Sequence, residues 1–271
     1  MIEQDTRNQP AYVIGVDWGS SSFRAYLLHI STDAVSIVER MADQVGIIHQ
    51  AQQDNQFNAG FEHYLGDKLN QWIKEYSVQT IILCGMVGSD KGWKEVPYQA
   101  TAVNLSTLAK HLFKVQLSSE VVCYIVPGVS YVCGDVADVM RGEETQILGC
   151  CVSLDIRNGL FCLPGTHCKW AKVDDAQITA FSTFITGELI YILSNHSILT
   201  SQVSDKVDDI DAFQAGLALA QQQPYLLNSL FQVRVNYLMK RITKEQSWDF
   251  LRGLCIGSEL VAAKNYYDKA E

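Results

Sequence analysis

Two short turns of glycine and small polar residues limit the possible folds of this chain more than any other feature. The first turn, at 19–22, follows the apolar run 12–18, and the second turn, at 164–166, follows the apolar run 160–163. Each turn leads into another β-rich run, so each half of the chain is expected to contain a turn whose backbone N–H groups a ligand can approach. Two similar α/β halves of this kind predict a ligand held in a cleft between them.

Hydrophobic periodicity places strands and helices around these turns. The expected strands are 12–18, 23–30, 35–41, 80–84, 121–126, 160–163, 169–173 and 178–184. The expected helices are 57–75, 139–151, 187–195, 208–221, 224–240 and 244–267. The first three strands predict an antiparallel meander, and the wholly apolar strand 80–84 is of the kind that is buried on both faces.

The charge of the chain excludes two classes of partner. The net charge is −9, so we expect binding neither to nucleic acid nor to anionic membrane surfaces, whereas a small anionic ligand is compatible with a few local cations. Apolar residues make up 48% and charged residues 19%, which suits a globular protein with a substantial core. The N-terminus is polar, and no apolar run approaches the roughly 18 residues that a membrane helix needs, so a cytoplasmic location is expected.

The eight cysteines are expected to be reduced and to behave as small hydrophobic side chains. Most of them lie in apolar stretches, and no CxxC pair occurs. Only Cys162 with His167 and Cys168 approaches the ligand spacing of a zinc site, and we do not predict zinc from that spacing.

Residue types suited to chemistry gather near the first turn and in the segment 85–98. Asp17 closes a strand, where its carboxylate is placed to hold a hydrated Mg²⁺ beside the small residues of the turn. The alternative for this turn is a plain hairpin connection. In 85–98, two aromatic and two lysine side chains follow the end of a buried strand, where α/β folds bind ligands. The alternative for this segment is a solvent-exposed loop. Neither a Walker A motif nor a GxGxxG motif occurs in the chain.

Two acidic residues, Glu143 and Glu144, stand at the start of the helix expected near 139–151. Acidic side chains there can simply complement the helix dipole, a contribution of about 0.3–1 kcal/mol. That interpretation stays open for Glu144, which is expected to face solvent, and we favour a functional role for Glu143.

The strings around these residues resemble those of a known enzyme family. DWGSSSFRAYLL, GMVGSDKGWKEVPY, IVPGVS, DVMRGEETQILG and LPGTHCKW are similar to strings of 2-dehydro-3-deoxygalactonokinases, in the actin/hexokinase-like ATPase superfamily. The similarity runs from Asp17 to about Leu199 and continues more weakly to about Leu260. It implies an α/β fold of two ribonuclease-H-like domains with a ligand cleft between them. It also implies ATP-dependent phosphorylation of the 6-hydroxyl of 2-dehydro-3-deoxy-D-galactonate in D-galactonate degradation.

The resemblance implies a division of the chain into two domains. Residues 1–132 would carry the first phosphate turn and the sugar-acid pocket, and residues 133–271 would carry the second phosphate turn and the nucleotide site. Family members continue past the position of Ala262 with a strand, a Gly-Ser turn and further helices that contribute to the adenine pocket. This sequence ends at Glu271, so the family's C-terminal end is expected to be missing.

The resemblance also implies roles for single residues. In the glycerol-kinase-like branch, a Gly-Asp pair opens a helix about two dozen residues before the second phosphate turn, and its Asp is the catalytic base. Gly142-Glu143 stands at that spacing before Thr166, so the catalytic residues are expected to be Glu143 and Arg141. ATP and Mg²⁺ are expected to bind Asp17 (the metal ligand), Gly19, Ser20, Ser21, Gly165, Thr166, His167 and Lys169. The sugar acid is expected to contact Ser22, Arg24, Met86, Gly88, Ser89, Trp93 and Tyr98.

An acidic protein that binds an acid needs a positioned cation, because a desolvated and unpaired carboxylate costs several kcal/mol. The candidate cations are Arg24, Lys91, Lys94, Arg141 and Lys169. A planar guanidinium suits bidentate carboxylate recognition, so Arg24 and Arg141 are preferred. The alternatives are that Arg141 pairs with a neighbouring glutamate and that Arg24 extends to solvent. Backbone amides near Gly88-Ser89 would then hold the carboxylate.

Two other functions are open to the sequence. One is a non-catalytic sugar-acid sensor, a degenerate kinase that keeps the cleft. The other is a superfamily ATPase that acts on protein partners, which the size of the chain and the lack of an obvious partner-binding extension disfavour. The expected partners are therefore a small sugar acid and ATP, and a homodimer is compatible with the sequence.

Overall fold

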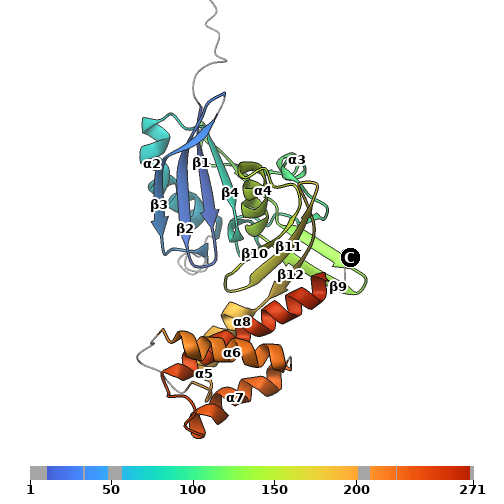
Figure 1. Cartoon of the computed structure of the whole chain (residues 1–271). Helices are drawn as coiled ribbons and strands as arrows, with labels where there is room; N and C mark the ends of the chain where they lie inside the picture. Colours follow the sequence, from blue (N-terminus) through green and yellow to red (C-terminus); the bar gives the residue numbers. More distant parts are fainter. Residues whose placement is uncertain (1–10, 33, 48–56, 201–207, 224, 269–271) are drawn as a thin grey trace, which may run out of the picture. The chain divides into compact units, whose positions relative to one another are not determined.

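A computed structural model describes residues 11–268 except 33, 48–56, 201–207 and 224. Two compact units form in it: Met1–Leu160 with Ala171–Phe181, and Phe161–Trp170 with Ser182–Glu271 (Figure 1). These units are defined by contacts between residues. The functional division into 1–132 and 133–271 is a separate matter and stays a prediction.

A six-stranded sheet of order β3–β2–β1–β4–β7–β6 forms the centre of the first unit. Its strands are β1 (Ala11–Trp18), β2 (Phe23–Ile30), β3 (Val35–Asp43), β4 (Thr80–Cys84), β6 (Phe113–Gln116) and β7 (Val122–Ile125). The strands β1, β2 and β3 pair antiparallel, which confirms the predicted meander, coloured blue in Figure 1. The strands β1, β4 and β7 run parallel, so their carboxyl ends meet at one end of the sheet.

The helix α2 (Phe57–Glu75) forms over the residues that periodicity predicts. Its apolar side chains Phe61, Leu65 and Leu69 recur every four residues and are buried in the same core as Trp18 and other sheet residues. The rings of Phe61 and Trp18 lie 5.1 Å apart. The apolar side of the helix therefore packs against one face of the sheet.

The strand β4 corrects one expectation, because it is not buried on both faces. Ile81 and Leu83 are fully buried in the core, but Ile82 between them is 38% exposed. The side chains of a strand alternate between the faces of the sheet, and the hydrophobic core that contains Ile81 and Leu83 lies on one of them.

The helix predicted at 139–151 begins later than expected. Val136–Met140 is the strand β9, which pairs antiparallel with β8 (Val129–Cys133), and β5 (Gln99–Ala100) joins β8 to complete a three-stranded sheet. The helix α4 spans Glu143–Ser153, after Gly142 with φ of +110°. That backbone angle lies outside the helical region, so Gly142 separates the strand from the helix.

The three-stranded sheet β10–β11–β12 contains the second turn. Its strands are β10 (Gly159–Leu163), β11 (Cys168–Asp174) and β12 (Gln177–Phe184), which confirms the predicted strand and hairpin. Asp175 and Ala176 have φ of +49° and +58°, as a two-residue hairpin turn of primed type requires. The boundary between the two compact units falls within this sheet.

Helices dominate the rest of the second unit and confirm the predicted helical half. They are α5 (Thr186–His196), α6 (Ile210–Gln222), α7 (Leu226–Leu238) and α8 (Gln246–Tyr267), drawn in yellow to red in Figure 1. The core between them includes Leu230, Val233 and Leu254. Among the described residues, no helix combines the length and apolar character that crossing a membrane requires.

Candidate active site

The first turn closes the β1–β2 hairpin of the first unit. The N–H of Gly19 donates to the carbonyl oxygen of Ser22 over 2.9 Å. Gly46 packs directly against the turn. A Cβ at this position would lie 2.0 Å from the carbonyl oxygen of Ser20, so the close contact depends on glycine. Ser20 and Ser21 are exposed, so the turn combines a braced backbone with an outer edge that is open to solvent.

Asp17 precedes this turn and pairs with Arg24 across the hairpin. Its Oδ2 lies 3.2 Å from Nη1 of Arg24, with the two side chains 25% and 51% exposed respectively. One donor of Arg24 is therefore committed within the protein. The parallel register places Asp17 opposite Cys84 at the end of β4. Burial raises the pKa of the Cys84 thiol, and the nearby carboxylates of Asp17 and Glu144 raise it further, so the thiol stays neutral.

Two glycines bring the end of β4 and the start of α4 together. Gly85 has φ of +90° and Gly142 has φ of +110°. A Cβ on Gly142 would lie 3.2 Å from the Cα of Gly85, and a Cβ on Gly85 would lie 3.2 Å from Oδ1 of Asp17. This close backbone contact places Asp17 and the first residues of α4 in one region of the first unit.

Glu144 is fully buried, which corrects the expectation that it faces solvent. Its Oε2 accepts the N–H of Gly142 over 2.6 Å, and its Oε1 accepts the hydroxyl of Thr145 over 2.9 Å. Burial raises the pKa of Glu144 to about 7, although both hydrogen bonds favour the carboxylate. Glu143 is only partly buried, and its Oε2 accepts the N–H of Arg141 over 3.2 Å. Of the two carboxyl groups, Glu144 is enclosed by the turn and Glu143 keeps contact with solvent.

Arg141 has a buried guanidinium, with the residue only 8% exposed. Its Nη2 donates to the carbonyl oxygen of Val96 over 2.7 Å, and its Cζ lies 4.4 Å from the centre of the Tyr98 ring. A Cβ on Gly88 would lie 2.8 Å from Nη1, so this approach depends on glycine. The Nε and Nη1 atoms have no hydrogen-bond partner in the described structure. The interpretation that Arg141 merely pairs its guanidinium with a neighbouring glutamate finds no such bond there.

The other substrate residues predicted in 85–98 differ in burial. Ser89 is buried, and its hydroxyl donates to the carbonyl oxygen of Met86 over 2.8 Å. Trp93 is 1% exposed and is part of the hydrophobic core of the first unit, so it anchors the segment 85–98 to that core. Tyr98 is 41% exposed and covers Arg141. The lysines at 91 and 94 are exposed and partly buried, respectively. The structure therefore brings Gly88 and Tyr98 to Arg141.

The second turn lies in the second unit and is held by the start of α5. A Cβ on Gly187 would lie 2.3 Å from the carbonyl oxygen of Gly165, and the N–H of Glu188 donates to the carbonyl oxygen of Thr166 over 3.0 Å. His167 Nε2 lies 2.6 Å from Oε2 of Glu188. Gly165, Thr166 and His167 are exposed, whereas Lys169 is 5% exposed. This turn, like the first, has a braced backbone and an open edge.

The donor groups of the first unit suit an anionic ligand accompanied by a hard cation. A carboxylate oxygen such as Oδ1 of Asp17 is a ligand type that Mg²⁺ prefers. The small residues of the first turn allow phosphate oxygens to approach backbone N–H groups. The N–H groups of Arg141 suit a carboxylate or phosphate.

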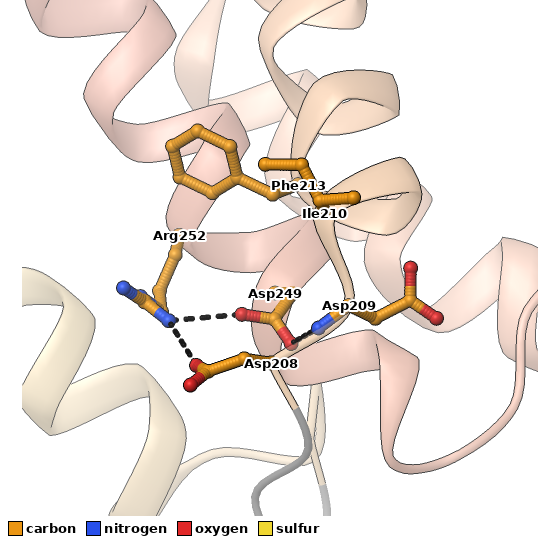
Figure 2. Close-up of a pocket in the computed structure, with 6 residues that line it drawn as sticks. All are labelled: Asp208, Asp209, Ile210, Phe213, Asp249 and Arg252. Atoms are coloured by element: carbon orange, nitrogen blue, oxygen red, sulfur yellow. Dashed lines mark hydrogen bonds and ion pairs between the residues drawn. The ribbon is translucent and has the colours of Figure 1, made fainter.

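A separate pocket of about 280 Å³ lies in the second unit, where residues before α6 face the start of α8 (Figure 2). Nη1 of Arg252 lies 2.9 Å from Oδ1 of Asp249 and 3.7 Å from Oδ1 of Asp208. Oδ2 of Asp249 accepts the N–H of Asp209 over 2.9 Å, and Asp209 in turn caps α6 by accepting the N–H of Ala212. These charged groups pair with one another, and through them the start of α8 is bonded to the residue that caps α6.

Sequence reasoning missed Thr145 and Val96 as partners of site residues. Val96 carries no local signal, because it contacts Arg141 only in the fold, whereas Thr145 is the sequence neighbour of Glu144, the residue that it contacts. The hairpin β8–β9 did carry a signal: valine-rich runs stand on both sides of the turn pair Gly134-Asp135. Recognising that hairpin would have moved the start of the helix to Glu143.

Comparison with known proteins gives a consistent result. A family model for 2-keto-3-deoxy-galactonokinase matches residues 17–271. The chain is 33% identical over 256 residues to the 2-dehydro-3-deoxygalactonokinase of Escherichia coli (strain K12), with 94% of this chain and 82% of that protein covered. It is 34% identical over 260 residues to DgoK1 of Rhizobium meliloti (strain 1021), a candidate enzyme of the same name, with 93% and 80% covered.

A solved structure agrees with these matches. The crystal structure of a candidate 2-dehydro-3-deoxygalactonokinase from Sinorhizobium meliloti superposes with a TM-score of 0.77 at 30% identity, covering 93% of this chain and 80% of that one. The α/β fold class expected from the sequence is thereby confirmed. The family match over nearly the whole chain, together with these identities, shows that this chain belongs to the 2-keto-3-deoxy-galactonokinase family of sugar-acid kinases.

Proposed function

We propose that this chain transfers the γ-phosphoryl group of ATP, with Mg²⁺, to the 6-hydroxyl of 2-dehydro-3-deoxy-D-galactonate. The relative from Escherichia coli is named for a kinase of this sugar acid. The observation that carries the proposal is the buried guanidinium of Arg141, two residues before the partly exposed carboxylate of Glu143, which accepts the backbone N–H of Arg141. A cytoplasmic location and a homodimer stay predictions.

Arg141 is proposed to bind the carboxylate of the sugar acid. A buried guanidinium with unsatisfied N–H groups is costly, and an anionic ligand that accepts from Nε or from Nη1 would remove part of that cost. The carbonyl oxygen of Val96 accepts from the third nitrogen, Nη2, and so orients the planar group. The ring of Tyr98 lies over the face of that group. Ser89 and the backbone near Gly88 then border the ligand. Arg24 is less suited to this role because it already pairs with Asp17.

Glu143 is proposed to be the general base. It stands at the start of α4, two residues after Arg141, and keeps contact with solvent. Its carboxylate would accept the proton of the 6-hydroxyl as that oxygen bonds to the γ-phosphorus and ADP leaves. Glu144 fixes the backbone at Gly142 and so positions its neighbour.

The two turns are proposed to hold the nucleotide phosphates. Backbone N–H groups of the first turn, with Asp17 as the ligand of Mg²⁺, would serve one side, and the second turn with Lys169 would serve the other. When bound, Mg·ATP supplies the phosphoryl group and the metal neutralises its developing charge. The braced backbones of both turns support this role, because a preorganised phosphate site loses little entropy on binding.

The test is a steady-state assay of ADP formation with the sugar acid and with a neutral analogue that lacks its carboxylate. Arg141→Met should weaken transition-state binding of the acid by about 2–5 kcal/mol and that of the neutral compound far less, because only the acid loses a charged partner. Glu143→Gln should lower kcat by about 10²–10⁴ with little change in KM, because it removes the base and keeps the shape.

Arg157→Met is the matched control, since Arg157 is an exposed arginine of the same unit that pairs with Asp175. It should leave both substrates unaffected. Equal losses on the acid and the neutral compound in Arg141→Met would make that arginine structural. Binding of the sugar acid by the wild-type chain without any ADP formation would contradict the kinase assignment.

A further inference from the structure

Two cysteines and a glutamate of the second unit form a ligand cluster apart from the proposed catalytic residues. Sγ of Cys162 on β10 lies 3.7 Å from Sγ of Cys168 on β11. The ligand atoms of these cysteines and of Glu259 on α8 all lie within 4.8 Å of one another. In the described part of the chain, this is the one group of three or more such side chains that could hold a metal ion.

The separation of the two sulfur atoms matches a tetrahedral zinc site. Bonds of about 2.3 Å from Zn²⁺ to thiolate sulfur, at the tetrahedral angle, place the two sulfur atoms about 3.8 Å apart. The observed 3.7 Å therefore admits the ion with almost no movement of Cys162 or Cys168. Two thiolates and one carboxylate are ligands that zinc accepts, and they leave one position of the tetrahedron for water.

Hydrogen bonds already orient the carboxylate of the cluster. Oε1 of Glu259 accepts the indole N–H of Trp170 over 2.7 Å, so its other oxygen can face a metal. The hydroxyl of Tyr267 donates to the carbonyl oxygen of Trp170 over 2.6 Å, which adds a second bond between α8 and β11. Partners of this kind fix metal ligands in proteins and raise metal affinity.

Burial is graded across the cluster. Cys168 is 3% exposed and Glu259 is 8% exposed, whereas Cys162 is exposed. The exposed residue Cys162 would let an ion reach the cluster from solvent. Burial raises the pKa of both thiols, and Glu259 raises that of Cys168 further, so the metal-free thiols are protonated at neutral pH.

We propose that Cys162, Cys168 and Glu259 bind one Zn²⁺, with water as the fourth ligand. The ion would join the two ends of the second turn to each other and to α8. Binding displaces one proton from each thiol, and no oxidation or reduction takes place. Zinc binding at this site does not require the proposed kinase activity, although the ligands flank the second turn. The spacing of Cys162 and Cys168 did not predict it, because the third ligand comes from a distant helix.

The test is a titration of the full chain, reduced and stripped of metal, with Zn²⁺ in weak buffer. The wild-type chain should bind one ion and release two protons per ion. Cys162→Ser and Cys168→Ser should each weaken binding by at least about 100-fold, and Glu259→Gln, which keeps the bond to Trp170, by about 10–100-fold. Cys150→Ser, which removes an exposed cysteine of α4, is the matched control and should bind as the wild type does.

Co²⁺ provides a second measurement on the unmutated chain, so the proposal does not depend on how well the variants fold. A tetrahedral Co²⁺ spectrum with thiolate charge-transfer absorption should appear at one equivalent and vanish when Zn²⁺ is added. Three results would each overturn the site: zinc affinity in the millimolar range, undiminished affinity in both cysteine variants, or an octahedral Co²⁺ spectrum.

Discussion

Glu143 and Glu144 are neighbours in the chain whose environments differ at the scale of single side chains. The N-terminal turn of α4 directs Glu144 into the protein, where Gly142 and Thr145 bond to it, and leaves Glu143 in contact with solvent. A carboxyl group without a countercharge is costly to ionise when it is buried. This contrast shows Glu144 bonded within the framework, and it supports the proposal that Glu143 is the general base.

The stability of the first unit should depend on pH through Glu144. The pKa of this group rises from 4.5 in the unfolded chain to about 7 in the folded one, so the folded state binds the proton more tightly. The stabilisation is fully present below pH 4.5 and is lost as pH rises through about 7, by about 3 kcal/mol in total. Glu144→Gln removes the titration and should be the more stable protein at pH 8.5.

Urea unfolding followed by the fluorescence of the buried tryptophans at pH 5, 7 and 8.5 measures this difference. Glu120→Gln, which changes an exposed carboxylate of the same unit, should keep the slope of the wild type. If Glu144→Gln shows that same slope, the group does not titrate in this range.

At the scale of secondary-structure elements, the helices α6 and α8 pack backbone against backbone. A Cβ on Gly253 would lie 2.0 Å from the carbonyl oxygen of Phe213, and a Cβ on Gly216 would lie 2.2 Å from that of Phe250. Side chains at these positions would force the helices apart. The two glycines therefore set the distance between α6 and α8, which in turn places Glu259 on α8.

Gly253→Ala should destabilise the second unit by about 1–3 kcal/mol, because the added methyl group meets backbone atoms that cannot rotate away. Thermal unfolding measured by circular dichroism reports the change. Gly149→Ala is the matched control, since a Cβ at that position of α4 meets nothing within 4 Å. It should stabilise its helix by about 0.5–1 kcal/mol. Similar effects of the two variants would show that close packing does not govern α6 and α8.

At the scale of the whole molecule, the two turns belong to different compact units: Asp17 to one and Thr166 to the other. If one Mg·ATP contacts both, Asp17→Asn and Thr166→Val should each raise the KM for ATP about tenfold or more, and their effects should not be additive. Asp17→Asn should also raise the Mg²⁺ concentration needed for half-maximal rate.

Binding of the sugar acid without nucleotide, followed by thermal shift, is the internal control and should be nearly unchanged in both variants. A wild-type response to ATP and Mg²⁺ in either variant would remove that turn from the nucleotide site.

The sequence by itself determined the elements whose signals are local. The apolar stripe of 57–75 specified α2, and turn residues between β-rich runs specified the meander and the β11–β12 hairpin. Local signals also indicated the two turns and the glutamate pair, because glycine, serine and acidic residues have conformational and electrostatic preferences that hold in any fold.

Tertiary structure alone decided which of these residues meet and how deeply they are buried. Arg141 contacts Val96 and Tyr98, and Glu144 is enclosed, where the turn at Gly142 packs closely on Gly85. Cys162 and Cys168 acquire Glu259 in the same way, through α8. Burial and long-range contact depend on the path of the whole chain, and a residue's own neighbours in sequence do not contain that information.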